Sequence, residues 1–335
     1  MGALTAYSFD DEWLPVEESS APGRVRRCAV QYAQRIGFSD HRAGEVAIAA
    51  TELATNLQHH AVHGIMLVRV RRDFEEPGLQ LLAIDSGPGI SDFTRIAADG
   101  ESTRGTLGIG LGAVMRMASS FAVHSVPGRG TVMNAMFYAA AEPSPRAPVA
   151  GFTRPISGET TCGDAWGYYA VEDRLYVVLA DGLGHGELAA TASREAVKTF
   201  LSDKTESDLS QSLQRMDAAL QPTRGAAVGT MCIDRGANSV TFAGVGNIAA
   251  WVDDGDRRRA LASIPGIVGT KIKKIQAVQM PLNRDCRIVM HSDGLSSKWD
   301  LREYPGLRAK ELPLIAATLL RDAGIRHDDA SVVVA

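Results

Sequence analysis

The residues best suited to carry chemistry in this chain are aspartates at the ends of short apolar runs. Asp181 follows the run 175–180 and is followed by glycines at positions 182, 184 and 186. A carboxylate beside such a flexible turn can offer its own oxygens and a neighbouring carbonyl oxygen to one hard divalent cation. An Asp-Gly pair alone predicts only a turn, so a metal site depends on whether other carboxylates accompany Asp181.

Further acids stand at the edges of other predicted strands, where a rigid scaffold holds functional groups. Asp164 precedes a strand, Asp293 follows the apolar residues 288–290, and Asp328 and Asp329 precede the last strand. If the fold brings these strand ends together, like charges raise the carboxyl pKa values unless cations neutralise them. Two divalent ions bridged by one carboxylate are a known arrangement of this kind, and they activate water as a nucleophile.

Five segments, four of which contain these acids, carry a resemblance to a known family. In order they are SGETTCGDAW, VVLADGLGHG, FAGVGN, MHSDGL and HDDASVVV, over about residues 150–335. They resemble motifs of the metal-dependent (PPM) protein phosphatases of the SpoIIE/RsbX type. The resemblance implies an α+β sandwich of packed antiparallel sheets with flanking helices. It also implies in-line attack of a metal-activated water on phosphoserine or phosphothreonine.

This resemblance assigns roles at a site for two Mn²⁺ or Mg²⁺ ions. Asp181 is expected to bridge the ions, and the main-chain carbonyl of Gly182 to complete the protein ligands of one ion. Asp293 and Asp328 are expected to bind the other ion, with Asp164 nearby and acting through water.

Three residues near these motifs each have more than one interpretation. Arg154 is a hypothesis for binding the substrate phosphate in bidentate fashion, and a surface salt bridge is the alternative. His185 could act as a general acid or a ligand, but the resemblance implies no zinc-type ligation, so a non-catalytic role is favoured. Asp329 is expected either to cap main-chain groups or to stand behind the ligands and support them.

A second set of residues, in the first half of the chain, has the types and spacing of a nucleotide site. Glu52 and Asn56 are four residues apart on a predicted helix and share one face, although a solvated polar pair has the same spacing. Further on, IDSGPGI (84–90) ends a strand in an acid and a glycine turn. The glycines of GTLGIGLG (105–112) let main-chain amides approach phosphates at the start of a helix. A Rossmann site is not predicted, because no βαβ unit or later ribose-binding acid accompanies them.

Three segments of this half resemble a known nucleotide-binding superfamily. They are ATELATN, AIDSGPGI and GTLGIGLGA, which resemble the N, G1 and G2 boxes of the GHKL ATPases over about residues 20–138. The closest likeness is to the anti-sigma and switch-protein serine kinases of the RsbW/RsbT type. It implies the α/β sandwich of the GHKL (Bergerat) fold. A histidine kinase is a weaker interpretation, because no long helical pair with a phosphoacceptor histidine precedes the ATP domain.

The GHKL resemblance implies ATP with Mg²⁺ as cofactor and gives single residues their roles. Asn56 is expected to bind the Mg²⁺ that bridges the phosphates, and Glu52 to orient or deprotonate the attacking serine hydroxyl. Asp85 is expected to read the adenine amino group. Arg104, in an expected lid over residues 99–106, is a hypothesis for contact with the γ-phosphate. The glycines expected to shape the adenine floor and then cradle the phosphates are Gly87 and Gly89, followed by Gly108, Gly110 and Gly112.

The elements that position these residues fall into two domains separated by a proline-rich stretch. Three closely spaced prolines between residues 139 and 148 disfavour helix and sheet. We therefore expect a kinase-type domain over residues 1–138, a linker over 139–150 and a phosphatase domain over 151–335. In the first domain, one mixed sheet with helices on one face is expected. Its predicted helices cover 23–36, 41–60 and 109–119, with Ser39 or Asp40 as an N-cap, and its strands cover 65–71, 79–84, 121–126 and 131–138.

The second domain is expected to consist mainly of strands in packed antiparallel sheets. The predicted helices cover residues 187–201, 208–220 and 310–323. The predicted strands cover residues 166–171, 175–180, 229–234, 239–244, 248–252, 277–280, 287–291 and 330–334.

Composition excludes several classes of protein. The net charge of −4 gives no general attraction to nucleic acid or anionic membranes, and no apolar run reaches the ~20 residues that span a bilayer. The four cysteines are widely separated, so neither a disulfide framework nor a zinc site is expected. The first residues lack the pattern of a signal peptide, and a cytoplasmic location is expected. The basic triplet 257–259 is expected to be a solvated hairpin edge.

Together the two resemblances predict a bifunctional regulator, a serine kinase fused to an opposing phosphatase. The expected substrate is a STAS-domain phosphoprotein of a partner-switching pathway that controls a sigma factor or another output. Tethering raises the effective concentration of a shared substrate at both sites, and reciprocal regulation is expected because simultaneous activity wastes ATP. In one alternative only the phosphatase is catalytic, with a nucleotide-responsive binding module; in another the chain sequesters its partner without catalysis. Relatives of the kinase half dimerise, so a homodimer through this domain is also considered.

Overall fold

The computed structural model of the chain describes residues 4–7, 11–72, 76–91, 110–139, 147–204, 208–272, 275–283 and 285–335. The chain forms two compact units. The first unit comprises Met1–Phe9, Ala147–Glu303 and Asp322–Ala335, and the second comprises Asp10–Arg146 and Tyr304–Arg321. Most of the expected linker, residues 140–146, lies outside the described residues, so its extended character stays a prediction.

The second unit is built on one five-stranded sheet with helices packed on one face. All neighbouring strands described in this sheet pair antiparallel, so the expected mixed sheet is wrong. The hairpins β3–β4 and β5–β6 reverse the chain directly, whereas a parallel pair needs a long crossover. The strand order is β2 (Asp11–Pro15), β3 (Ile65–Arg71), β4 (Gly78–Asp85), β6 (Gly130–Phe137) and β5 (Ser120–Val126), and the helices are α1 (Ala21–Arg35), α2 (Asp40–His60) and α4 (Gly110–Met117).

Helix α2, which carries Glu52 and Asn56, is fixed at its start. The side chain of Ser39 accepts a hydrogen bond from the Arg42 amide at 3.2 Å, which confirms Ser39 as the N-cap. The buried Arg42 guanidinium donates to the carbonyls of Tyr138 and Met117 at 2.8 and 2.6 Å. Tyr138 directly follows β6 and Met117 is the last residue of α4. The Arg42 side chain therefore links α2 to both β6 and α4.

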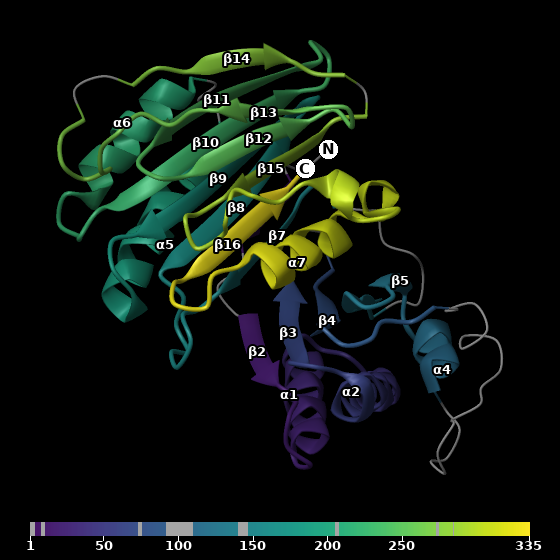
Figure 1. The fold of residues 1–335 in the computed structure, drawn as a ribbon. Helices are drawn as coiled ribbons and strands as arrows, with labels where there is room; N and C mark the ends of the chain where they lie inside the picture. Colours follow the sequence, from purple (N-terminus) through teal and green to yellow (C-terminus); the bar gives the residue numbers. More distant parts are fainter. Residues whose placement is uncertain are drawn as a thin grey trace. The chain divides into compact units, whose positions relative to one another are not determined.

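The first unit is a sandwich of two antiparallel sheets, as expected. Alternate residues of both sheets meet in one core, with Trp166 and Leu179 from the six-stranded sheet and Met290 from the five-stranded sheet. Helices α5 (Gly186–Ser202) and α6 (Leu209–Leu220) pack on the other face of the six-stranded sheet (Figure 1). In order, the six-stranded sheet contains β1 (Leu4–Tyr7), β8 (Asp164–Val171), β9 (Arg174–Gly182), β10 (Ala226–Asp234), β11 (Ser239–Val245) and β14 (Val278–Pro281), and the five-stranded sheet contains β13 (Arg258–Leu261), β12 (Ala249–Asp253), β15 (Arg287–His291), β16 (Ala330–Val334) and β7 (Ala150–Arg154).

The two units interleave along the sequence more than one linker implies. Strand β1, close to the start of the chain, pairs with β8 of the first unit. The segment Tyr304–Arg321, which contains most of α7 (Leu312–Ala323), belongs to the second unit. Within that unit, Arg321 donates to the Asp85 carbonyl at 3.0 Å. A segment of the phosphatase-like sequence therefore contacts the residue expected to read adenine.

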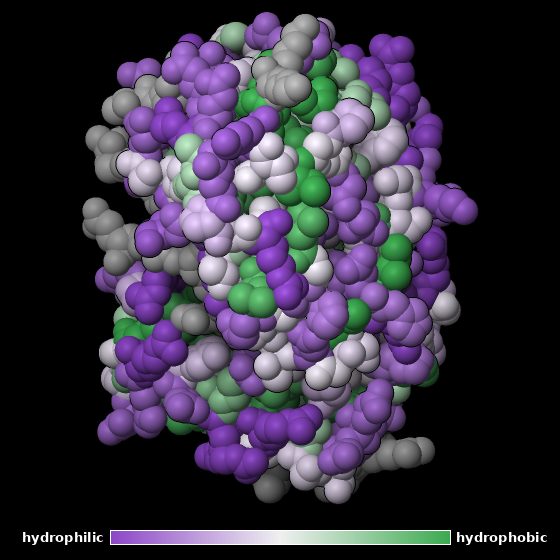
Figure 2. Space-filling view, turned by 90° about the vertical axis from the view of Figure 1, so that its left-hand side faces the viewer, coloured by the Kyte–Doolittle hydropathy of each residue, from purple (hydrophilic) through white to green (hydrophobic). Residues whose placement is uncertain are grey.

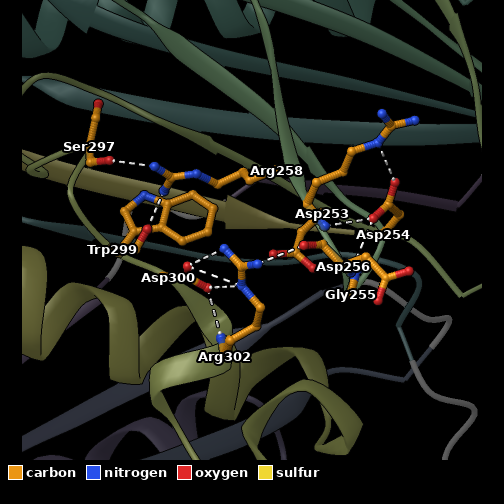
Figure 3. A network of polar contacts seen from close by, with 10 residues as sticks. Asp253, Asp254, Gly255, Asp256, Arg258, Ser297, Trp299, Asp300 and Arg302 are labelled. Carbon is orange, nitrogen blue, oxygen red and sulfur yellow. Dashed lines mark hydrogen bonds and ion pairs between the residues drawn. The ribbon is translucent and has the colours of Figure 1, made fainter.

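The basic triplet lies at the β12–β13 hairpin, and its middle residue is not simply solvated. The Arg258 guanidinium lies 4.1 Å from the ring centroid of Trp251 and 4.3 Å from that of Trp299. It also donates to the carbonyls of Ser297 and Trp299 (Figure 3). The expected solvated edge is wrong for Arg258, because two aromatic faces and two carbonyl acceptors hold the cation against the protein. The flanking arginines of the triplet face Asp254, at 3.5 and 3.9 Å.

The face of the molecule in Figure 2 is mainly polar. On the face in Figure 2, hydrophilic residues surround smaller groups of hydrophobic ones. Leu183 and Leu188, close in sequence to Asp181, are among the few large apolar side chains that are exposed. Within the described ranges, no helix combines the length and the apolar character needed to cross a membrane.

Candidate metal centre and nucleotide site

The strand ends of the first unit bring four of the predicted acids to one edge of the sandwich. Asp164, at the start of β8, lies directly opposite Asp181, near the end of β9. Strands β15 and β16 are antiparallel neighbours. Asp293, just after β15, and Asp328, just before β16, therefore lie at the same end of their sheet.

A serine between the sheets fixes one of these carboxylates. The Ser292 hydroxyl donates to Asp164 Oδ2 at 2.7 Å and accepts from the Ser331 amide at 3.0 Å. Ser292 directly precedes Asp293, so the same short segment carries one predicted ligand and orients a second acid across the sandwich.

This edge is electrostatically unfavourable for ionised carboxylates. Burial, followed by the charges of Asp164, Asp293 and Asp328, raises the pKa of Asp181 to about 10. Burial raises the pKa of Asp164 to about 7, although the hydrogen bond from Ser292 opposes the shift. Burial and then Asp293 also raise the pKa of Asp328. Divalent cations would reverse this balance, because a bound cation is the largest local charge in a site.

The acids fit a metal centre by type and position, but they are not assembled as ligands. Asp164 Oδ1 is buried and has no hydrogen-bond partner, as expected for an oxygen that faces a cation or its water shell. Among the residues that the structure describes, however, no group of three or more His, Cys, Asp or Glu side chains has the geometry of a metal site. The ligand roles of Asp181, Asp293 and Asp328 stay predictions.

The turn after Asp181 requires glycine where the carbonyl ligand is expected. A Cβ on Gly182 would lie 2.0 Å from the carbonyl oxygen of Ala189, so no other residue fits against the first turns of α5. The Gly182 amide donates to the Gly163 carbonyl at 3.2 Å. The main chain beside Asp181 is thereby held between α5 and the segment before Asp164.

His185 lies in the same turn and contacts an acid. Its Nδ1 pairs with Glu159 Oε1, and among the causes that act on the raised pKa of Asp328, after burial and Asp293, it is a small opposing one, so the imidazole faces the acidic edge. It precedes α5 as the N-cap residue without a side-chain cap hydrogen bond. These contacts give His185 a place in the turn, and they do not test a catalytic role.

Arg154 and Asp329 lie beside the acidic edge on neighbouring strands. Arg154, at the end of β7, lies opposite Ala330 and donates to the Ile325 carbonyl at 2.9 Å. Within the described part of the chain no salt bridge of Arg154 occurs, so the alternative of a surface ion pair is not observed. Burial, and then the charge of Arg326, lower the Arg154 pKa. Asp329 accepts hydrogen bonds from the Ile156 and Gly163 amides at 2.8 and 2.9 Å, which confirms the expected capping role.

Two polar residues at this edge, Ser292 and Asn247, have no role that the sequence predicts. The Asn247 Nδ2 donates to Asp293 Oδ2 at 2.6 Å. Both stand in segments that carry the family resemblance, MHSDGL and FAGVGN. Their place in those segments is the only feature of the sequence that could point to them. Neither is an acid, and neither belongs to the residue types whose spacing indicates a metal site.

The predicted nucleotide residues of the second unit lie on α2 and at the end of β4. Glu52 and Asn56 share one face of α2 and are both half-buried. The Asp85 carboxylate accepts the Gly87 amide at 2.6 Å, and burial raises its pKa. A Cβ on Gly87 would lie 2.8 Å from Asp85 Oδ1, and Gly89 has a φ of +72° with the Val126 carbonyl against it. This turn therefore holds the carboxylate in one orientation.

The expected phosphate loop is described only in part. Gly110 begins α4 with a φ of +53°, and Gly112 is buried in its first turn. Gly108, Arg104 and the expected lid over residues 99–106 lie outside the described residues. The phosphate-cradling role of these glycines stays a prediction.

Comparisons with known proteins find relatives for two parts of the chain. The "Histidine kinase-like ATPase domain" family matches residues 15–136, and the "Stage II sporulation protein E (SpoIIE)" family matches residues 171–335. Serine/threonine-protein kinase RsbT of Bacillus subtilis is 35% identical over 112 residues, which cover 33% of this chain and 84% of RsbT. Phosphoserine phosphatase RsbX of the same organism is 26% identical over 179 residues, which cover 53% of this chain and 88% of RsbX.

A solved structure supports the fold of the phosphatase-like part. A crystal structure of RsbX in complex with magnesium superposes with a TM-score of 0.50 at 23% identity, over 56% of this chain and 92% of that chain. The expected GHKL-like fold in the N-terminal part and PPM-like fold in the C-terminal part are confirmed.

Proposed function

The chain belongs to the RsbT family of serine/threonine kinases and also carries a SpoIIE-type phosphatase domain. We propose that it phosphorylates and dephosphorylates the same residue of one substrate protein. The shared substrate is a STAS-domain protein of a partner-switching pathway. The observation that carries the phosphatase half is the direct cross-strand pair of Asp164 and Asp181, with Asp293 and Asp328 at the same edge of the sandwich.

In the phosphatase half, the acidic edge would hold two Mn²⁺ or Mg²⁺ ions. Asp181 would be the ligand that both ions share, the Gly182 carbonyl, Asp293 and Asp328 would be the other protein ligands, and Asp164 would act through water. When bound, such ions would supply an activated water as the nucleophile for attack on phosphorus. Arg154 holds the phosphate oxygens through the guanidinium edge that does not bind the Ile325 carbonyl. The magnesium complex of RsbX supports ions of this type.

In the kinase half, α2 and the β4 turn form the ATP site. Asn56 binds the Mg²⁺ that accompanies ATP, and Glu52, one helical turn earlier on the same face, orients the serine hydroxyl and accepts its proton. Asp85, held by the Gly87 amide, reads the adenine amino group. Gly87 and Gly89 shape the adenine floor, and Gly108, Gly110 and Gly112 bind the phosphates through their amides.

Sharing one substrate is the advantage that the fusion gives. RsbT is a serine/threonine kinase and RsbX a phosphoserine phosphatase, and both activities joined in one chain act on the same STAS protein at a raised effective concentration. A chain in which only the phosphatase is catalytic would bind nucleotide but transfer no phosphate.

Labelled ATP distinguishes these functions. Purified chain, a STAS-domain protein, Mg²⁺ or Mn²⁺ and γ-labelled ATP should give labelled STAS protein, and Glu52→Ala should abolish labelling. Glu17→Ala, at an exposed acid of the same unit, is the matched control and should label normally. Label that persists in Glu52→Ala would reject the kinase assignment, and absence of label with wild type would favour the phosphatase alone.

The phosphatase half is tested with phosphorylated STAS protein. Wild-type chain should release phosphate only with Mn²⁺ or Mg²⁺ present, and Asp181→Asn should release none. Asp234→Asn, at the opposite end of the neighbouring strand β10, should keep wild-type activity. Release that is unaffected by EDTA would reject the metal centre.

A further inference from the structure

One corner of the sandwich, between β11 and β12, has no role in the chemistry described so far. The FAGVGN segment ends at Asn247, between β11 and β12, and the Asn247 side chain reaches the acidic edge. Its Nδ2 donates to Asp293 Oδ2 at 2.6 Å. A hydrogen bond to an ionised acceptor of this length is about twice as strong as one between neutral groups.

The corner that presents Asn247 is tightly packed. Gly246 has a φ of +96°, and a Cβ there would lie 2.5 Å from the Cβ of Ala227. A Cβ on Gly244 would lie 2.3 Å from Ser263 Oγ, and the Gly246 amide donates to the Ile264 carbonyl at 2.9 Å. These contacts hold the main chain before Asn247 in a single conformation.

The same corner is in register with the bridging acid. Ala227, against which Gly246 packs, lies directly opposite Asp181 on the neighbouring strand. Packing of Gly246 against Ala227 therefore fixes how far the turn at Asn247 lies from β9, which carries Asp181. From this turn the Asn247 side-chain amide reaches Asp293.

We infer that Asn247 is a positioning residue that holds Asp293 as a metal ligand, an inference that rests on the proposed metal centre. The exposed Asp293 side chain shares its edge with Asp181 and Asp328, and like charges push it toward solvent. The amide donor occupies one Asp293 oxygen and leaves the other free for a cation. A neutral donor suits this place, because a lysine would compete with the cation and an aspartate would add to the repulsion.

Titration of EDTA-treated protein with Mn²⁺ in a calorimeter tests this role directly. Asn247→Ala and the similarly shaped Asn247→Leu should each bind Mn²⁺ about tenfold or more weakly, the usual loss when a partner of a metal ligand is removed. Asn283→Ala, at an exposed asparagine in the loop between β14 and β15, should bind Mn²⁺ as wild type does. Thermal unfolding without metal should remain cooperative in all three variants, which shows that they fold.

Two outcomes overturn the inference in distinguishable ways. Mn²⁺ affinity in Asn247→Ala or Asn247→Leu equal to that of wild type would reject the positioning role and leave the proposed phosphatase intact. A wild-type chain that binds no Mn²⁺ and hydrolyses no phosphoprotein would reject the metal centre itself.

Discussion

Replacing the proposed bridging acid should stabilise the metal-free protein while it destroys the phosphatase. In the unfolded chain Asp181 ionises with an ordinary pKa of 3.8, whereas in the fold its pKa is raised to about 10 by burial, Asp164, Asp293 and Asp328. At neutral pH, folding without metal must therefore keep a proton on Asp181 that the unfolded chain releases. Asp181→Asn removes this cost, because its amide is neutral in both states.

The size and sign of the effect follow from linkage. One pKa unit corresponds to about 1.4 kcal/mol, so at about pH 7.5 the cost of the Asp181 proton is up to about 5 kcal/mol. Below the unfolded pKa, the folded and unfolded states both hold the proton, and the acid does not change the free energy of unfolding. Above it, the acid destabilises the fold by an amount that grows with pH until the folded pKa is reached. The gain from Asp181→Asn should therefore be small near pH 4 and increase with pH toward about 10, the folded pKa of Asp181.

Urea unfolding in EDTA, followed by tryptophan fluorescence, measures the gain. Three of the four tryptophans, Trp166, Trp251 and Trp299, lie in the first unit, so the signal reports mainly on the sandwich. Asp234→Asn is the matched control with the opposite sign, because the Ala237 amide and Arg174 lower the Asp234 pKa. A metal-free Asp181→Asn chain no more stable than wild type at about pH 7.5, or equally stabilised at every pH, would refute the reasoning.

Three other perturbations have defined outcomes. Arg258→Ala should destabilise the first unit by about 1–3 kcal/mol, because two tryptophan faces and two carbonyls lose their cation; urea unfolding checks this, and unchanged stability would show that the contact is not formed. Arg154→Ala should raise KM for phosphorylated STAS protein more than it lowers kcat, and an unchanged KM in steady-state phosphate release would remove Arg154 from the phosphate site. The two activities should respond in opposite directions to bound nucleotide, so phosphate release measured with and without a non-hydrolysable ATP analogue should differ; equal rates under every ligand condition would count against reciprocal regulation.

The sequence predicts most of the elements because their patterns are local. Strand β3 covers the predicted residues 65–71, and α2 begins at the predicted cap Ser39. The acidic edge was also predictable, because Asp181, Asp293 and Asp328 each stand at the end of an apolar run. Antiparallel pairing then places those ends together.

The remaining features depend on contacts between residues far apart in the chain. Arg258 lies against Trp299, and Asn247 binds Asp293, each across more than forty residues. No local pattern marks such pairs. The antiparallel order of the second unit's sheet and the place of the segment Tyr304–Arg321 in that unit also depend on packing alone. Strand β7 was missed because Ala150–Arg154 is too short and mixed to show an alternation.

The central claim is that one chain both adds and removes the same phosphate, and the intact mass of a STAS-domain protein tests it most directly. With ATP and Mg²⁺, Asp181→Asn should convert the STAS protein to the singly phosphorylated form, while Glu52→Ala should leave it unmodified. Glu52→Ala added to the product after ATP is removed should restore the unphosphorylated mass, and the double variant should do neither. A phosphate that Asp181→Asn fails to add, or that Glu52→Ala fails to remove, would contradict the account.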